Sequence, residues 1–303
     1  MKRVVSISLG SPKGDFSVTK TLLGEEFEIS RIGTNGNQTK FAELMRELDG
    51  KVDAFGLGGI DMYLYAGDRR YTICDAARLA SNAKITPVVD GSGIKNTIER
   101  ETINWLQEKQ VINFPTKKVL VVCGVDRFGM AEAVAKHAGS VIFGDLMFNL
   151  GIPIPLHTYK QLLFIAKTLL PIVCRIPFQW LYPTGEKQDK ITPKYEKYFQ
   201  WADIIAGDYK IIGRFMPLPE SGALEGKTVI TNTLTAADVE NLRARGVKSL
   251  ISATWDFEGR TFATNVLEGI IVTLAGKRPE EMKPRDYMDV LNKLNWEPTI
   301  RTL

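Results

Sequence analysis

The stretch Gly124-Val125-Asp126-Arg127-Phe128-Gly129 decides the fold prediction, because a buried strand at residues 118–123 precedes it and a helical pattern at 130–138 follows. A glycine turn between a strand and a helix is typical of Rossmann-type nucleotide-binding domains. Asp145 ends the next predicted strand, 21 residues after Gly124. In such domains an acidic residue at that place binds the adenosine ribose. The order of these elements favours a nucleotide site over a plain βαβ scaffold.

The turn departs from the usual pattern at one position. Gly124 and Gly129 fill the first and third glycine positions, but the middle one is Asp126, whose carboxylate would face the negative pyrophosphate. Arg127 can compensate in part. Asp145 favours NAD over NADP, because a 2′-phosphate would meet a like charge, and its alternative role is a surface residue or helix cap. The predicted cofactor contacts in this part of the chain are Gly124, Asp126, Arg127, Phe128, Gly129 and Asp145.

Strand and helix signals alternate on both sides of this turn, so we predict two α/β domains. The first covers residues 1–112 and binds the substrate. The second covers residues 113–303 and is a Rossmann-type, mostly parallel sheet with a helical apolar insert near residues 151–201. The predicted strands are 4–9, 26–32, 52–57, 86–89, 118–123, 140–143, 203–206, 228–231 and 249–253, and the predicted helices include 41–48, 95–109, 130–138, 236–245 and 265–275.

Polar residues at strand ends are the candidates for chemistry, since ligands of open α/β sheets bind there. Hydride transfer from an alcohol needs a base or a polarising group, and a lysine whose pKa is lowered beside a carboxylate is one solution. Lys95 with Asp90 or Asp61 is the best such pair; otherwise Lys95 is solvated and Asp90 is a cap. Other candidates are Asn232 and Thr233 for the cofactor, and Ser11, Lys13, Arg260 and Asn265 for the substrate, with Asn265 alternatively capping a helix.

Composition narrows the function classes. The 303 residues carry a net charge of +4 with no basic block, so no nucleic-acid partner is expected. Cys74, Cys123 and Cys174 are far apart in the sequence with no CxxC pair, which argues for a reducing cytoplasm and against a disulfide framework. His137 and His157 are isolated, so we expect no metal site. The first residues alternate like a strand and are not a signal peptide.

The apolar insert has several interpretations. Residues 162–178 are strongly apolar, but Pro171, Pro177, Lys167 and Arg175 interrupt them well short of the roughly 20 residues that a membrane span needs. The segment is either a kinked helical pair between the domains or in a homodimer interface, or a cover over the cleft. A contact with a membrane surface through residues 158–183 is the remaining alternative.

Three stretches resemble proteins of the quinate/shikimate 5-dehydrogenase family: Val4-Val5-Ser6-Ile7-Ser8-Leu9-Gly10-Ser11, Asp53-Ala54-Phe55-Gly56-Leu57-Gly58-Gly59-Ile60-Asp61 and Gly259-Arg260-Thr261-Phe262-Ala263-Thr264-Asn265-Val266. The resemblance implies an N-terminal domain for a polyhydroxylated cyclohexane carboxylate and a C-terminal domain for NAD(P). The family's Asn-Val-Thr-x-Pro-x-Lys motif is absent from the sequence, and Lys95 is only an approximate counterpart of its lysine. The architecture therefore transfers better than the substrate.

The expected function is that of a cytoplasmic NAD-dependent oxidoreductase acting on a hydroxylated, carboxylated small molecule in an interdomain cleft. Lys95 would polarise or deprotonate the hydroxyl, and Arg260 would hold an anionic group. One alternative is a transferase using S-adenosylmethionine, which has no pyrophosphate for Asp126 to repel. Another is a non-catalytic nucleotide- or lipid-binding protein. The substrate, the reaction direction, the oligomeric state and catalysis itself stay open at this point.

Overall fold

The structure is a computed structural model that describes residues 1–177, 191–232, 234–254, 256–257 and 260–303. Its first sheet has the strand order β2-β3-β1-β4-β7. Four of these strands run parallel, and β2 pairs antiparallel with β3. The central strand is buried almost throughout, as a strand covered on both faces must be. The strands are β1 (Lys2–Ser8), β2 (Phe16–Leu22), β3 (Glu25–Gly33), β4 (Ala54–Gly58) and β7 (Val88–Val89), and a separate hairpin joins β5 (Tyr63–Ala66) and β6 (Arg69–Thr72).

The second sheet has the strand order β15-β12-β11-β10-β8-β9. Five strands are parallel and β15 pairs antiparallel with β12. The chain order reverses between β8 and β10, and the carboxyl ends of strands at such a reversal form the usual ligand crevice of an open α/β sheet. The strands are β8 (Lys118–Val121), β9 (Ser140–Phe143), β10 (Ile204–Ala206), β11 (Thr228–Thr231), β12 (Ser249–Ser252) and β15 (Thr299–Thr302), and β13 (Asp256–Phe257) pairs with β14 (Arg260–Thr261) outside the sheet.

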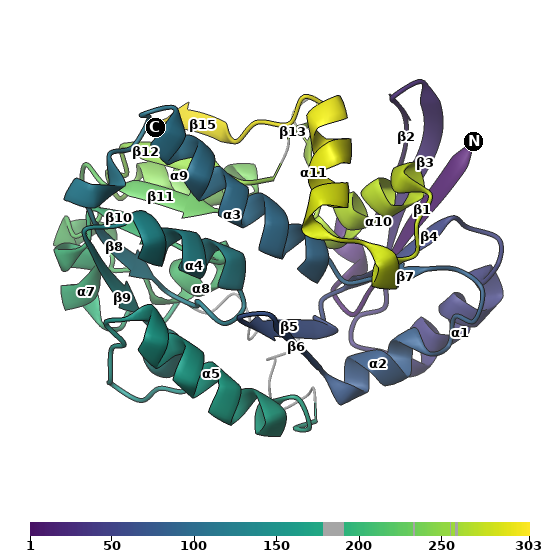
Figure 1. Cartoon of the computed structure of the whole chain (residues 1–303), viewed down its shortest axis with the longest axis horizontal. Coiled ribbons are helices and arrows are strands. Elements are labelled where there is room, and N and C mark those ends of the chain that lie inside the picture. Colours follow the sequence, from purple (N-terminus) through teal and green to yellow (C-terminus); the bar gives the residue numbers. More distant parts are fainter. Residues whose placement is uncertain (178–190, 233, 255, 258–259) are drawn as a thin grey trace.

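Helix α3 (Ser92–Glu108) runs from the first sheet's half of the molecule into the second's (Figure 1). It begins beyond Gly91, whose φ of 90° lies in the left-handed region that favours glycine. A Cβ there would also come 2.6 Å from Thr264 Oγ1. The other α-helices are α1 (Gln38–Leu48), α2 (Cys74–Ala80), α4 (Phe128–His137), α5 (Tyr159–Val173), α7 (Glu196–Trp201), α8 (Tyr209–Phe215), α9 (Ala236–Arg243), α10 (Thr264–Ala275) and α11 (Pro284–Lys293).

The core joins the two sheets. The largest cluster of buried apolar side chains includes Phe55 of β4 in the first sheet together with Val119 of β8 and Phe128 of α4 in the second. Helix α10 follows the five parallel strands of the second sheet in the chain but packs against β1 and β4 of the first. Asn265 of α10 donates a 2.7 Å hydrogen bond to Ser6 Oγ of β1. The carboxyl-terminal helices thus return to the first sheet, and the boundary predicted near residue 112 stays a prediction.

The predicted fold class is confirmed: both halves are mixed α/β with mostly parallel sheets. The sequence from Tyr63 to Ile73 also predicts a hairpin turning at Gly67-Asp68, and this hairpin is present as β5 and β6. Sequence reasoning missed strands β2 and β15 and helices α2, α8 and α11. Within the apolar insert the structure describes helix α5, which contains Pro171, while residues 178–190 lie outside the described residues. No helix among the described residues is long and apolar enough to cross a membrane.

Candidate functional site

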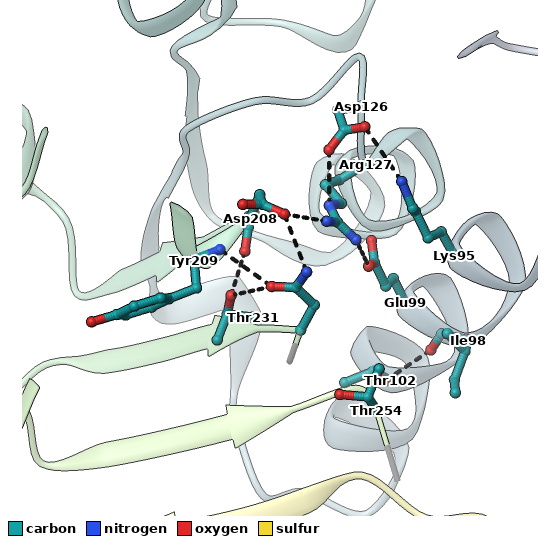
Figure 2. A network of polar contacts seen from close by, with 12 residues as sticks. Lys95, Ile98, Glu99, Thr102, Asp126, Arg127, Asp208, Tyr209, Thr231 and Thr254 are labelled. Carbon is teal, nitrogen blue, oxygen red and sulfur yellow. Dashed lines mark hydrogen bonds and ion pairs between the residues drawn. The ribbon is translucent and has the colours of Figure 1, made fainter. Parts of the chain in front are cut away.

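A cluster of charged side chains lies where the ends of the two sheets meet helix α3, and we call it the Lys95 cluster (Figure 2). Lys95 and Glu99 stand one turn apart on α3, and the loops that follow strands β4, β8 and β10 bring the other members to them. The cluster consists of Asp61, Lys95, Glu99, Asp126, Arg127 and Asp208.

Lys95 bridges the two halves of the molecule. Its Nζ lies 2.5 Å from Asp61 Oδ1, beyond β4, and 3.7 Å from Asp126 Oδ1, beyond β8. Burial alone would lower the pKa of Lys95, but the carboxylates of Asp126 and Asp61 outweigh burial and raise it above its usual range. This corrects the expectation of a lowered pKa: Lys95 is charged at neutral pH and can polarise an oxygen atom, but it is no base.

Arg127 holds the buried side of the cluster. Its guanidinium forms ion pairs with Glu99 and Asp208, and its Nε lies 3.1 Å from Asp126 Oδ2. Glu99 is only 1% exposed, and no hydrogen bond reaches its Oε2 in the described part of the chain. Burial raises the pKa of Glu99 to about 7 against the opposing effect of Arg127. Glu99 therefore exchanges a proton near neutral pH.

Asp208 is fixed from two further directions. It accepts hydrogen bonds from Asn232 Nδ2 at 3.1 Å and from the backbone nitrogen of Lys210 at 2.8 Å. Burial alone would raise the pKa of Asp208, but Arg127 and Lys210 outweigh burial and lower it. Asn232 in turn accepts from the backbone nitrogen of Tyr209. Asn232, predicted to contact a cofactor, thus belongs to the polar shell of the cluster.

The cluster has a buried base and a partly exposed rim. The side chains of Asp61, Asp126 and Asp208 are 18%, 21% and 17% exposed, whereas that of Arg127 is 3% exposed. Four carboxylates face two cations, so the fully ionised cluster carries an excess of negative charge. Burial raises the pKa of Asp126 despite Lys95 and Arg127, which reduces that excess in part. In the described part of the chain no three His, Cys, Asp or Glu side chains are arranged to hold a metal ion.

The glycine turn after β8 is not free to receive a phosphate. Asp145 Oδ2 accepts a 3.0 Å hydrogen bond from the backbone nitrogen of Gly124, and its Oδ1 accepts one of 2.8 Å from Val125. Asp145 is 5% exposed, and burial raises its pKa to about 6, although both amides oppose this. Phosphates of a dinucleotide bind to the backbone amides of such a turn. Here the chain's own carboxylate occupies the amides of Gly124 and Val125, so in this arrangement these two amides do not fit a phosphate.

The third glycine of the turn serves helix packing. A Cβ on Gly129 would lie 2.2 Å from the carbonyl oxygen of Asn96, so only glycine lets α4 approach α3 so closely. Phe128 beside it is 3% exposed, and its ring lies 5.6 Å from that of Tyr159. These two residues, predicted to contact a cofactor, therefore face the interior between helices.

The remaining predicted site residues lie apart from the Lys95 cluster or outside the described part. Asp90 accepts hydrogen bonds from the backbone nitrogens of Met62, Tyr63 and Ser92, while the N-cap residue of α3 is Gly91. Ser11 caps a short 3₁₀ turn that contains the exposed Lys13. Asn265 bonds Ser6 of the first sheet. Thr233 and the side chain of Arg260 lie outside the described residues.

Sequence reasoning missed Glu99 and gave Asp208 no role. Glu99 stands four residues after Lys95, and residues at that spacing share one face of a helix. Asp208 directly follows β10, next to the strand that precedes the glycine turn in the sheet. The helical spacing of Glu99 and the strand-end position of Asp208 can both be recognised in the sequence. The sequence does not show that Arg127 lies between these two carboxylates.

Comparisons with solved structures give only distant likenesses. One is a solute-binding protein of an ABC transporter from Burkholderia graminis in complex with D-arabinose, with 9% identity, a TM-score of 0.39, and coverage of 99% of this chain and 95% of that one. Another is an NAD-dependent malic enzyme from Thermotoga maritima, with 12% identity, a TM-score of 0.38, and coverage of 97% and 84%. At these scores neither likeness bears on ligand or activity.

Comparisons of the sequence reach only families without an assigned role. No curated protein matches the chain. Residues 3–90 match a family profile described as Domain of unknown function (DUF8753), and residues 93–303 match a second, which extends over more than half of the chain. The two matches meet beside Gly91, where α3 begins. The chain therefore belongs to the family described as Domain of unknown function (DUF8754).

Proposed function

We propose that the chain is an enzyme that binds a neutral, polyhydroxylated small molecule at the rim of the Lys95 cluster and moves a proton on one of its hydroxyl groups. The observation that carries the proposal is the position of Lys95 Nζ between Asp61 and Asp126, at the carboxyl ends of strands from both sheets. Ligands of open α/β sheets bind at such strand ends. The partly exposed carboxylates of Asp61, Asp126 and Asp208 are acceptors for hydroxyl groups.

The charge of the cluster selects the ligand class. Its excess of carboxylates over cations repels an anion, and the one further cation that was predicted to hold a carboxylate, Arg260, has a side chain outside the described residues. A neutral polyol meets no such repulsion. Each hydrogen bond between a hydroxyl and a charged carboxylate contributes about 1.5–3 kcal/mol. We therefore propose a neutral polyol in place of the carboxylated substrate that the sequence suggested.

The proposed roles follow from the charges. Lys95 is charged and donates a hydrogen bond to the substrate oxygen, which stabilises negative charge that develops there. Asp61 is partly exposed and forms an ion pair with Lys95, and its carboxylate accepts the hydroxyl proton. Glu99, which is buried and paired with Arg127, gains or loses a proton near pH 7, and its protonation state changes the net charge of the cluster. We derive no step through NAD, because the turn that would hold its phosphates is filled by Asp145.

A ligand panel with matched compounds tests the proposal. Thermal unfolding is followed with myo-inositol, with quinate, which adds a carboxylate to a similar ring, and with NAD, NADP and S-adenosylmethionine. We expect a higher melting temperature with the neutral polyol than with quinate, and loss of that shift in Asp61→Asn. Arg100→Gln in α3, which changes a partly exposed ion pair with Glu132 of α4, is the control and should keep the shift.

Two outcomes would contradict the proposal. If quinate stabilises the chain more than inositol, the charge argument fails. If NAD, NADP or S-adenosylmethionine stabilises it and no polyol does, the ligand is a nucleotide and the Lys95 cluster is structural. Polyol-dependent formation of reduced nicotinamide, followed by absorbance, would in addition establish the hydride transfer that the family resemblance implies.

A further inference from the structure

Two of the three cysteines, 100 residues apart in the sequence, meet in the fold. Cys74 is the first residue of α2, directly after the β5–β6 hairpin, and Cys174 ends α5. The backbone nitrogen of Cys74 donates a 2.9 Å hydrogen bond to the carbonyl oxygen of Cys174. The sequence separation had argued against a disulfide, but the fold removes that separation.

The spacing suits a disulfide. A direct backbone hydrogen bond brings the two residues into contact, and a disulfide needs Cα atoms about 4.4–6.8 Å apart. The side chains also interact. Burial raises the pKa of Cys174 to about 11, and the negative charge of a Cys74 thiolate adds to that shift. This interaction between the thiols agrees with the backbone contact between the two residues.

The pair has one accessible thiol and one protected thiol. Cys74 is exposed, whereas Cys174 is 4% exposed. An oxidant from solution reaches Cys74 first, and Cys174 is placed to resolve the product. The third cysteine, Cys123, is buried at the end of β8 and accepts a hydrogen bond from Asn149, so it takes no part in the pair.

We propose that Cys74 and Cys174 are a reversible disulfide site for small disulfides such as oxidised glutathione. The Cys74 thiolate attacks one sulfur of oxidised glutathione, forms a mixed disulfide and releases one molecule of reduced glutathione. The Cys174 thiolate then attacks the Cys74 sulfur, forms the Cys74–Cys174 bond and releases the second. The two protein thiols lose two protons and two electrons, and oxidised glutathione takes them up as two thiols.

The bond would join the two sides of the candidate site. Asp61 lies just before the hairpin that leads into Cys74, and α5 covers the glycine turn, since a Cβ on Gly124 would lie 2.8 Å from Leu162 of that helix. Helix α5 also packs against β5. The disulfide therefore ties the hairpin to the helix that covers the turn and restricts their separation. This inference holds whether or not the proposed polyol activity does.

Oxidation of the full chain tests the inference. The chain is incubated with oxidised glutathione, and its peptides are mapped by mass spectrometry without reduction. We expect a cross-linked peptide pair containing Cys74 and Cys174, with a loss of two hydrogen atoms. Dithiothreitol should reverse the bond. Closing a loop of this length should raise the melting temperature by roughly 5–10 °C.

Three cysteine variants and a search for a glutathione adduct on Cys74 test whether the internal disulfide forms. Cys74→Ser and Cys174→Ser should each abolish the cross-link and the thermal shift, whereas Cys123→Ala should keep both. A glutathione adduct that persists on Cys74 with no internal bond would overturn the inference, as would a cross-link through Cys123. The wild-type peptide map is sufficient even if the Cys174 variant does not fold.

Discussion

The first two residues of the glycine turn after β8 differ from the Lys95 cluster, to which the next two turn residues belong, in what their polar groups leave open. In the turn, the amides of Gly124 and Val125 already have a carboxylate partner, and Asp145 is almost fully buried. In the cluster, Asp61 and Asp126 are paired with Lys95 yet remain about one-fifth exposed. Different residues of one turn motif can therefore have different roles: the first amides bind a carboxylate of the chain itself, while Asp126 contributes an accessible polar group to the Lys95 cluster.

The largest effect is expected from Arg127, the cation on which the buried side of the cluster depends. Arg127→Met leaves Glu99, Asp126 and Asp208 without it, and removal of one partner from a buried ion pair destabilises a protein by about 3–5 kcal/mol. Urea unfolding at pH 7 measures this. Arg100→Met in α3, which removes a partly exposed ion pair with Glu132 of α4, should change stability by at most about 1 kcal/mol. Equal effects of the two variants would mean that the cluster is not a buried charge network.

The second effect concerns the proton on Glu99. Its pKa is about 7 in the folded chain against 4.5 for an ordinary glutamate, so the folded state binds the extra proton between these values. The contribution of this proton to the free energy of unfolding is fully present below pH 4.5. It is lost as the pH rises through 7, and the total loss is roughly 3 kcal/mol. Unfolding between pH 5 and 8 should therefore show a decline that Glu99→Gln reduces.

Glu268 is the matched control for this titration. Burial, with a contribution from Asp90, raises its pKa to about 7 against a small opposing effect of Lys95, and both its oxygens have hydrogen-bond partners outside the cluster, Tyr287 and Gly91. Glu268→Gln should flatten the pH dependence of stability without changing that of ligand binding, whereas Glu99→Gln should change both. Identical pH profiles of ligand binding in wild type and Glu99→Gln would show that the protonation of Glu99 does not affect ligand binding.

A smaller effect is expected where the turn meets α3. Gly129→Ala places a methyl group 2.2 Å from the Asn96 carbonyl oxygen and forces α3 and α4 apart, which should destabilise the chain by about 1–3 kcal/mol. Gly213→Ala in α8, whose Cβ would lie 3.4 Å from Tyr209, should instead stabilise it by up to about 1 kcal/mol. Thermal unfolding of both variants measures these effects. An unchanged stability of Gly129→Ala would contradict the packing role of Gly129.

Part of this picture was predictable from the sequence. The mostly parallel α/β architecture followed from alternating strand and helix patterns, and the Lys95–Asp61 contact followed from polar residues at strand ends. The position of Asp145 near the turn was also predictable, because a strand end 21 residues on lies beside it. Its partner was not, since the sequence does not say whether a carboxylate turns outward to a ribose or inward to the amides of Gly124 and Val125.

Contacts between distant segments could not be predicted. Helical spacing places Glu99 on the face of Lys95, but only the packing of α4 against α3 brings Arg127 to it. The meeting of Cys74 with Cys174 depends on where α5 ends against α2. The two strands of the main sheets that sequence reasoning missed, β2 and β15, pair antiparallel with their neighbours, and each lies at an edge of its sheet.

The affinity of myo-inositol for two variants tests the central claim most directly. Asp61→Asn removes a charged acceptor from the rim of the cluster, and Asp145→Asn changes the carboxylate that fills the glycine turn. Isothermal titration should show a roughly 10- to 100-fold loss of affinity in Asp61→Asn, equivalent to one charged hydrogen bond, and less than about a threefold change in Asp145→Asn. The reverse order would place the ligand at the turn and contradict the account.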